Sequence, residues 1–186
     1  MPIEAHVNRT WAMKWLVMGL VLIGFGGLCI KDGALVYPQQ QAQYEVYEGF
    51  AETDNMAGWV ERAESEGWST DPPPARSDMD IYTQWGMLAI SWPLGFAALG
   101  MVIWFRGRKL VATEEALVGH RGERVLYNSI TAIDKERWDS KGIAYVLWEE
   151  GEESGRIKID DWVFRDAWRV LDEVEDQTGL GEPVPG

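Results

Sequence analysis

Two long apolar segments dominate the hydrophobic pattern of this chain. The first runs from Trp15 to Ile30, and the second runs from Trp85 to Phe105 without a charged residue. A helix rises ~1.5 Å per residue, so about 20 apolar residues cross the hydrocarbon core of a bilayer. The pattern therefore predicts two transmembrane helices, the first within residues 1–30 and the second within residues 84–105.

The first segment has a second interpretation as a cleavable signal peptide, because a weakly basic start precedes its apolar core. The residues that follow, 30–34, contain no pair of small residues with the spacing of a cleavage site. The segment 26–29 ends in a cysteine, as a lipoprotein box does, but Leu28 occupies the place of the required small residue. We therefore expect an uncleaved span.

Charge around the two segments predicts their orientation. Lys and Arg near span ends remain on the cytoplasmic side during insertion. Residues 31–83 contain three basic and eleven acidic residues, whereas basic residues precede the first span and follow the second. We expect a multi-pass protein of the cytoplasmic (inner) membrane, with both termini cytoplasmic and residues 31–83 outside the cytoplasm. The basic residues beside the spans are Arg9, Lys14, Arg106, Arg108 and Lys109.

The ends of the spans carry the residue types that favour a membrane surface. Trp11, Trp15, Trp85 and Trp104 lie near the four ends, and tryptophan is enriched at the level of the lipid headgroups. A basic residue near anionic lipid contributes about 1 kcal/mol of attraction. The membrane-surface residues predicted from this are Arg106, Arg108 and Lys109.

Small residues within the spans predict close helix packing. Ser91 and Gly95 have the small-x-x-x-small spacing, and Gly24 and Gly27 lie in the first span. These residues pack the two spans either against each other or against other subunits, and the sequence does not favour one alternative. Pro93 is expected to bend the second span, because proline removes a helical hydrogen bond.

The acidic segment 31–83 divides into three parts. Residues 37–50 are expected to continue the first helix out of the membrane. Asp54 or Asn55 is suited to cap a short amphipathic helix that Gly67 ends, and a proline-stiffened linker follows. For the two tryptophans of this segment we prefer a place in the membrane interface over a contact with a partner protein; they are Trp59 and Trp68.

The C-terminal part, 106–180, predicts a small α+β domain. Short β-rich runs are followed by a pattern of apolar residues every three or four positions, which is typical of an amphipathic helix. The last residues, 181–186, contain glycine and proline and predict a flexible tail. The expected strands are 110–113, 116–119, 124–127, 130–133, 142–149 and 156–160, and the expected helix is 164–178.

This succession of short antiparallel strands and one C-terminal helix resembles the bacterial pleckstrin-homology-like domains of membrane proteins. The resemblance covers about residues 108–180, and it lies in apolar spacing, in the strand–turn–strand of 110–119 and in the final helix. It implies an antiparallel β-barrel or sandwich closed by that helix. The long acidic segment between the spans departs from the family, whose members usually have a short loop there.

Eukaryotic relatives of this fold often bind phosphoinositides through basic residues of the first hairpin. The corresponding hairpin here is 113–116, which contains Glu114 and Glu115. Two carboxylates repel a phosphate, so binding of a lipid headgroup by this domain is not expected. Trp168, in the closing helix, is expected to cap the sheet as a core residue.

Residues that carry chemistry are sparse. His6 and His120 have no zinc-type spacing with another ligand, and the single cysteine, Cys29, lies within the first span. Asp160 and Asp161 are adjacent, so in a strand their side chains point to opposite faces. No catalytic or phosphate-binding motif occurs, and neither span has a histidine that could bind haem. We expect neither an enzyme nor a protein with a metal or cofactor.

The expected function follows from small residues in both spans, eleven tryptophans and the lack of site chemistry. We expect a non-catalytic accessory or scaffold subunit of a larger integral membrane protein complex, with a small cytoplasmic docking domain. Its partners would be other membrane subunits and the lipid bilayer; no basic patch indicates nucleic acid, and no small-molecule substrate is identified. The alternative is a membrane-anchored sensor or binding module that reads a ligand outside the cytoplasm through residues 37–83.

Overall fold

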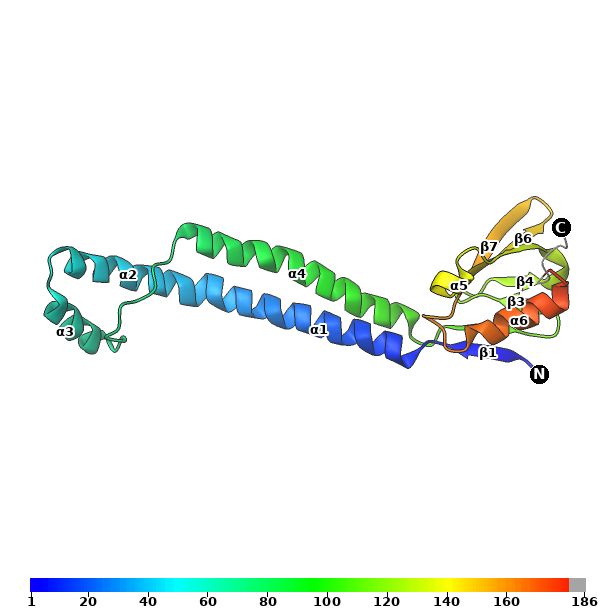
Figure 1. Ribbon diagram of the computed structural model, residues 1–186, viewed down its shortest axis with the longest axis horizontal. Helices are drawn as coiled ribbons and strands as arrows, with labels where there is room; N and C mark the ends of the chain where they lie inside the picture. Colours follow the sequence, from blue (N-terminus) through cyan, green and yellow to red (C-terminus); the bar gives the residue numbers. More distant parts are fainter. Residues whose placement is uncertain (181–186) are drawn as a thin grey trace. The chain divides into compact units, whose positions relative to one another are not determined.

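The computed structural model describes residues 1–180 (Figure 1). The tail 181–186, for which the sequence predicts flexibility, lies outside the described residues. The chain forms two compact units, which are described separately. The helical unit comprises Val17–Leu99, and the mixed unit comprises residues 1–16 together with those from Gly100 onward.

The helical unit is dominated by one long helical segment and one returning helix. Helix α1 (Arg9–Lys31) passes through a π-helical turn, η1 (Asp32–Val36), into α2 (Tyr37–Glu52), so helical structure continues for 44 residues. The expected extension of the first helix beyond the apolar segment is therefore present. The returning helix α4 (Asp78–Phe105) begins before its apolar part, and both helices are long and apolar enough to cross a membrane.

Within this unit, α1 and α4 pack through small residues. Gly26 and Gly95 are buried, and a Cβ at Gly26 would lie 2.2 Å from the Trp92 ring. A Cβ at Gly95 would lie 3.1 Å from the carbonyl oxygen of Gly19, so a side chain there would push the helices apart. The Trp92 Nε1 donates to the Ile23 carbonyl over 3.2 Å.

The four predicted packing residues separate into two pairs. Ser91 and Gly95 are buried between α1 and α4. Gly24 and Gly27 are exposed, with nothing within 4 Å of a Cβ placed on either. The first pair therefore packs the spans against each other, and the prediction of a contact with another subunit remains for the second pair.

A short helix, α3 (Met56–Glu66), follows α2. The Asn55 side chain accepts a hydrogen bond from the Gly58 amide at its start, and Gly67 ends it with φ of 70°. Both ends agree with the capping signals in the sequence.

A small aromatic cluster holds α3 in place. Trp59 is 1% exposed, packs edge-on against Tyr47 at 5.3 Å and lies 6.1 Å from Trp68. Its Nε1 donates to the Thr70 carbonyl over 2.9 Å. The preferred placement of Trp59 in the membrane interface is thus wrong, because its ring is the centre of this cluster and has no surface left for lipid.

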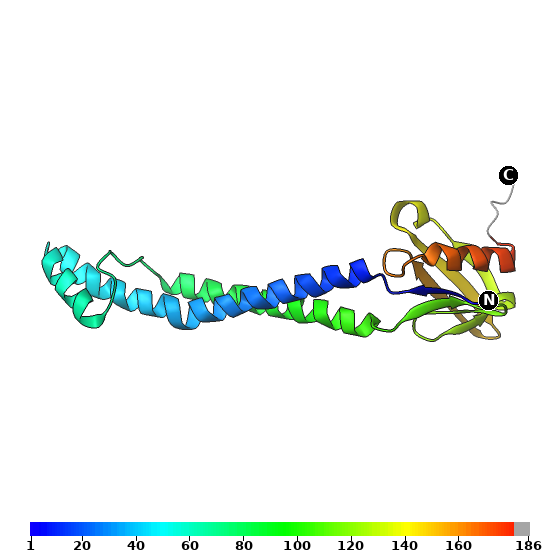
Figure 2. The ribbon, with the colours of Figure 1, turned by 90° about the horizontal axis from the view of Figure 1, so that it is seen from below.

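The mixed unit contains two antiparallel sheets and a covering helix. The first sheet has the strand order β1-β2-β3-β4, and the second has the order β5-β6-β7. Helix α6 (Ala167–Thr178) packs against β1, β2 and β7 (Figure 2). The strands are β1 (Ile3–His6), β2 (Lys109–Ala112), β3 (Ala116–Val118), β4 (Arg124–Leu126), β5 (Ile130–Asp134), β6 (Ile143–Glu150) and β7 (Glu153–Asp160), with a short helix α5 (Trp138–Lys141) between β5 and β6.

Strand β1 was missed by the sequence analysis. It pairs antiparallel with β2, with Ala5 opposite Leu110, and both residues are fully buried. The His6 carbonyl accepts a hydrogen bond from the Arg165 amide over 2.8 Å, and Val7 forms a bridge with Phe164. The chain before α1 and the chain after α4 therefore belong to one sheet, which places both helix ends at the same folded unit.

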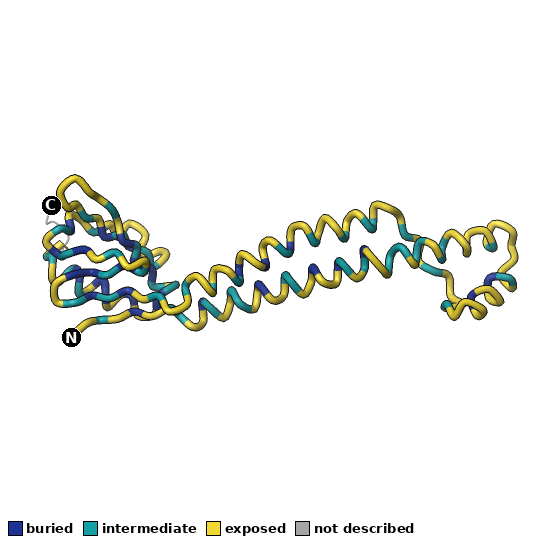
Figure 3. Tube along the Cα trace, turned by 180° about the vertical axis from the view of Figure 1, so that it is seen from behind, coloured by how far each residue is buried: buried dark blue, intermediate teal, exposed yellow. Residues whose placement is uncertain are grey.

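The core of this unit lies between the two sheets and α6. Figure 3 shows buried positions along the strands of this unit. From α6 the core receives Ala167, Val170, Leu171 and Val174, whereas Trp168 is 48% exposed. The prediction that Trp168 caps the sheet is wrong, because the helix begins at Ala167 and turns Val170 inward in its place.

Candidate functional site

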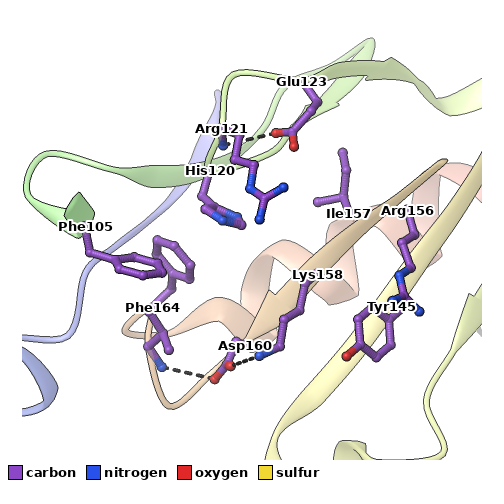
Figure 4. Close-up of a pocket in the computed structure, with 11 residues that line it drawn as sticks. Phe105, His120, Arg121, Glu123, Tyr145, Arg156, Ile157, Lys158, Asp160 and Phe164 are labelled. Atoms are coloured by element: carbon purple, nitrogen blue, oxygen red, sulfur yellow. Dashed lines mark hydrogen bonds and ion pairs between the residues drawn. The ribbon is translucent and has the colours of Figure 1, made fainter. Parts of the chain in front are cut away.

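A pocket of about 460 Å³ lies at one end of the mixed unit (Figure 4). Its wall is built from the residue that ends α4, the β3–β4 loop, strands β6 and β7, and the turn that precedes α6. The lining residues are Phe105, His120, Arg121, Glu123, Tyr145, Arg156, Ile157, Lys158, Asp160, Val163 and Phe164.

Three rings form the apolar side of the pocket. The His120 imidazole stacks on Phe105, with centroids 5.8 Å apart and ring planes 15° apart, and lies 5.6 Å from Phe164. Its Nδ1 is buried and has no hydrogen-bond partner among the described residues. Burial against these rings lowers the pKa of His120 below its ordinary value; the Glu123 carboxylate opposes this effect, and nearby basic side chains such as Arg121 add to it.

Three basic side chains form the polar side. Arg156 and Lys158 are two residues apart on β7, so they project from the same face of the sheet. The Arg156 guanidinium lies over the Tyr145 ring, 4.7 Å from its centroid. Figure 4 shows the Arg121 side chain extending from the β3–β4 loop into the space beside His120.

The two carboxylates of the pocket already have partners. Asp160 is buried and lies 2.6 Å from the Lys158 Nζ, and its other oxygen accepts hydrogen bonds from the amides of Trp162 and Val163. Glu123 accepts a hydrogen bond from the Arg121 amide over 3.0 Å. Both carboxylates therefore hold backbone loops in place, and neither forms an ion pair with an arginine of the pocket.

The β3–β4 loop needs its glycines for this arrangement. Gly122 has φ of 93°, a conformation that other residues rarely adopt. A Cβ on Gly119 would lie 2.6 Å from the Glu123 carboxylate and 3.3 Å from Ile157. Gly122 thus allows the turn of the loop, and Gly119 allows the close approach of the loop to Ile157 on β7.

The predicted membrane-surface residues lie in this same unit. Arg106 is exposed. Arg108 donates from Nε to the Trp104 carbonyl over 2.7 Å and lies over the Trp104 ring, while one terminal nitrogen is buried without a partner. Lys109 forms an ion pair with Glu4 over 2.6 Å. Arg108 and Lys109 therefore have structural contacts besides any contact with lipid.

Sequence reasoning missed this pocket because its residues are spread along the chain. In the sequence, His120 has no neighbouring residue at the spacing of a metal site, so nothing marks it as part of a pocket. The alternation of Arg156 and Lys158 on a predicted strand was the one available signal that two cations share a face. Nothing in the sequence showed that the β3–β4 loop and the end of α4 meet them.

The pocket combines basic side chains with aromatic rings. Among residues 1–180, no group of three or more His, Cys, Asp or Glu residues could hold a metal ion. Positive side chains beside an imidazole and aromatic walls are suited to hold an anion. No protein-family model matches this chain, and neither a curated protein nor a solved structure shows a significant match to it.

Proposed function

We propose that this protein is a non-catalytic accessory or scaffold subunit of a larger membrane protein complex. In this proposal α1 and α4 span the cytoplasmic membrane, and the mixed unit is a cytoplasmic docking domain. The observation that carries the proposal is the exposure of apolar side chains along both helices. Only 17% of the apolar window of each helix is buried, whereas a core helix of a water-soluble protein is mostly buried.

The exposed side chains are large. Val21, Ile90 and Phe96 are each more than half exposed. Transfer of apolar surface from water stabilises by about 25 cal/mol per Å², so such a surface needs lipid or another protein as its surroundings. A bilayer supplies these surroundings along the whole length of both helices.

The pairing of β1 with β2 supports an uncleaved first span. Cleavage after the apolar part of α1 would remove β1 from the sheet and expose the edge of β2, including Leu110. The same pairing requires that the chain before α1 and the chain after α4 lie on one side of the membrane. The excess of basic residues at these two places favours the cytoplasmic side.

Exposed aromatic and basic residues support a membrane-facing end of the docking domain. Trp104 and Trp162 are 61% and 60% exposed, and the Lys14 Nζ lies 4.6 Å from the centroid of the Trp162 ring. Asn8 binds the backbone of Trp162 and Val163, which keeps this turn beside the start of α1. Tryptophan and lysine together are typical of the headgroup layer.

The strand count supports the resemblance to pleckstrin-homology-like domains. The mixed unit contains a four-stranded sheet, a three-stranded sheet and the closing helix α6. In our proposal the two sheets close around the shared core as a barrel or sandwich. The proposal adds that the first strand is separated from the others by the two spans. Folds of this class serve many functions, so the docking role rests on the exposed spans and not on the fold.

The exposed glycines of α1 support a contact with a further subunit. Small residues let two helix backbones approach closely in lipid. Gly19 and Gly26 already serve the contact with α4, whereas Gly24 and Gly27 face open space. A transmembrane helix of another subunit could therefore pack on α1 at this position.

Gentle solubilisation of the tagged full chain at its native level tests the proposal. We expect a particle larger than the monomer, with specific membrane proteins retained. Gly24→Leu and Gly27→Leu should reduce their retention, and Gly49→Leu, at an open position of α2, is the matched control. A monomer without bound proteins, or a chain that stays dissolved without detergent, would contradict the proposal.

The alternative is a sensor of a ligand outside the cytoplasm, and the folded structure within the segment 37–83 favours it. The cluster around Trp59 gives this segment a small core of its own, and Arg76 stacks on Tyr37 at 4.0 Å. Changes in amide exchange within this segment on addition of a candidate ligand would support the sensor. The scaffold proposal expects no such changes.

A further inference from the structure

We propose that the pocket beside Phe105 binds a phosphate group through Arg121, Arg156, Lys158 and His120. The phosphate belongs either to the headgroup of an anionic lipid or to a soluble phosphate compound. The site itself rests on the pocket alone. The alternative in which a lipid of the bilayer supplies the phosphate also rests on the proposed membrane anchoring.

The first argument is the charge that remains available. Arg121 and Arg156 form no ion pair within residues 1–180, and Lys158 shares Asp160 with two backbone amides. A guanidinium binds phosphate through parallel hydrogen bonds, which are stronger than those between neutral groups. Two exposed guanidinium groups at one pocket, neither held in an ion pair of the described residues, are therefore available to bind an anion.

The second argument is the buried imidazole. The Nδ1 of His120 lacks a partner among the described residues, and a buried polar atom in this state destabilises the fold. A ligand oxygen, or a water molecule that the ligand holds, would satisfy this atom. Burial lowers the pKa of His120, and an anion in the pocket would act in the opposite direction by favouring the protonated imidazole.

The third argument concerns position along the chain. Phe105, which forms one wall, is the last residue of α4, the second candidate span. A pocket that begins where an apolar helix ends is well placed to receive the phosphate of a lipid. The exposed Arg106 follows immediately and adds positive charge at this point of the chain.

This site differs from the hairpin that the sequence analysis excluded. Residues 113–116 connect β2 to β3, whereas the pocket is formed by the β3–β4 loop and β7. Glu114 and Glu115 line a different hollow, which contains no basic residue. The acidic hairpin therefore has no bearing on a phosphate at Arg121.

Histidine NMR on the full chain tests the proposal directly. The protein has two histidines, and His6, exposed on β1, serves as an internal reference. The protein is held in maltoside micelles, which contain no phosphate, and is titrated with inorganic phosphate or phosphatidylglycerol. Diacylglycerol, which lacks the phosphate, is the matched lipid control. We expect a saturable shift of the His120 signals, with the His6 signals unchanged.

Two variants make the test specific. Arg121→Gln combined with Arg156→Gln should weaken binding at least tenfold. Arg124→Gln, which removes a neighbouring arginine paired with Glu115 outside the pocket, should leave it unchanged. Saturation by inorganic phosphate identifies a soluble ligand, and saturation by phosphatidylglycerol alone identifies a lipid headgroup; both outcomes support the site.

The proposal is overturned if neither probe gives a saturable shift, if diacylglycerol acts equally well, or if Arg124→Gln weakens binding as much as the double variant. These results are separate from the scaffold proposal. A chain that purifies alone can still bind phosphate, and a chain within a complex can lack the site.

Discussion

The two units of this protein treat their apolar residues in opposite ways. In the mixed unit Leu110, Leu117 and Ile159 are fully buried in a single core. In the helical unit Val21 and Ile90 are 63% and 66% exposed, and the contact between α1 and α4 is made by glycine and serine. These large residues point inward in the core of the mixed unit and outward on α1 and α4.

The difference agrees with our proposal that α1 and α4 lie in lipid and the mixed unit lies in water. In water, large side chains stabilise a fold by leaving the solvent. In lipid that driving force is absent, because the acyl chains are as apolar as leucine, and helices associate through close backbone packing. In our proposal the same residue types thus form a core in the mixed unit and a lipid-facing surface on α1 and α4.

The largest effect is expected from a charge placed in β1. Ala5→Asp puts a carboxylate into a fully buried position and should lower the free energy of unfolding of the mixed unit by about 3 kcal/mol or more. His6→Ala, at the next and exposed position, should change it by less than about 0.5 kcal/mol. Urea unfolding in micelles measures both. Equal stability of the two variants would mean that β1 does not belong to the sheet.

A leucine in each unit tests the comparison itself. Leu117→Ala should destabilise the mixed unit by about 2–5 kcal/mol, because it leaves a cavity in the core. Leu94→Ala, at a position 56% exposed on α4, should cost less than about 0.5 kcal/mol. The same urea titration applies. A large loss for Leu94→Ala would place that side chain in a protein contact instead of lipid.

A glycine pair on α1 tests the packing of the helical unit. Gly26→Leu should destabilise the packed pair of helices α1 and α4 by about 1–3 kcal/mol, because the new side chain collides with Trp92. Gly24→Leu, two residues earlier and facing open space, should leave the stability of the α1–α4 pair unchanged when no other subunit is bound. Unfolding by SDS, followed by tryptophan fluorescence, compares them. If the two variants lose the same stability, α4 packs on a different face of α1.

Removal of one aromatic wall should change the titration of His120. Phe105→Ala opens the imidazole to water and should raise its lowered pKa toward the ordinary value, whereas Phe105→Leu should keep it low. Because the folded pKa lies below the unfolded one, the linked stability is present above about pH 6.5 and is lost as the pH falls through the folded pKa. Histidine NMR measures the pKa. An ordinary pKa in the unmodified protein would contradict the burial.

The smallest effect is expected at the edge of the first sheet. The hydrogen bond from Lys109 lowers the pKa of Glu4, and His6 adds to this effect. The linked stability is therefore present above the unfolded pKa of Glu4 and is lost as the pH falls through the folded value. A double-mutant cycle of Glu4→Gln and Lys109→Gln should show a small coupling that salt reduces further. A coupling that salt leaves unchanged would indicate a buried pair.

Much of the fold could be predicted from local patterns. The apolar segments, the caps at Asn55 and Gly67 and the strands from β2 to β7 follow from periodicity and from residues with particular backbone preferences. Strand β1 has the same alternation, with Ile3 and Ala5 apolar between polar neighbours, but it is only four residues long. So short a run has no meaning until its partner strand, more than a hundred residues away, is known.

The errors and omissions depend on contacts between elements, which the periodicity of a single segment does not show. Trp59 and Trp168 have the same side chain, yet one is 1% exposed and the other 48%. Trp59 is covered because α2 and the segment after α3 fold against it, and Trp168 lies on the outer face of α6. The pocket at His120 likewise exists only because the end of α4, a loop and β7 meet.

The sequence by itself determined the length and polarity of the helices, the position of the acidic segment between them and the order of most strands, because these depend on neighbouring residues. Only the tertiary structure decided that the first strand pairs across both helices, that Gly19 and Gly26, and not Gly24 and Gly27, face α4, and that separated basic residues share one pocket. The physical reason is that burial and charge pairing are properties of groups that meet in space, and no local pattern records which groups those are.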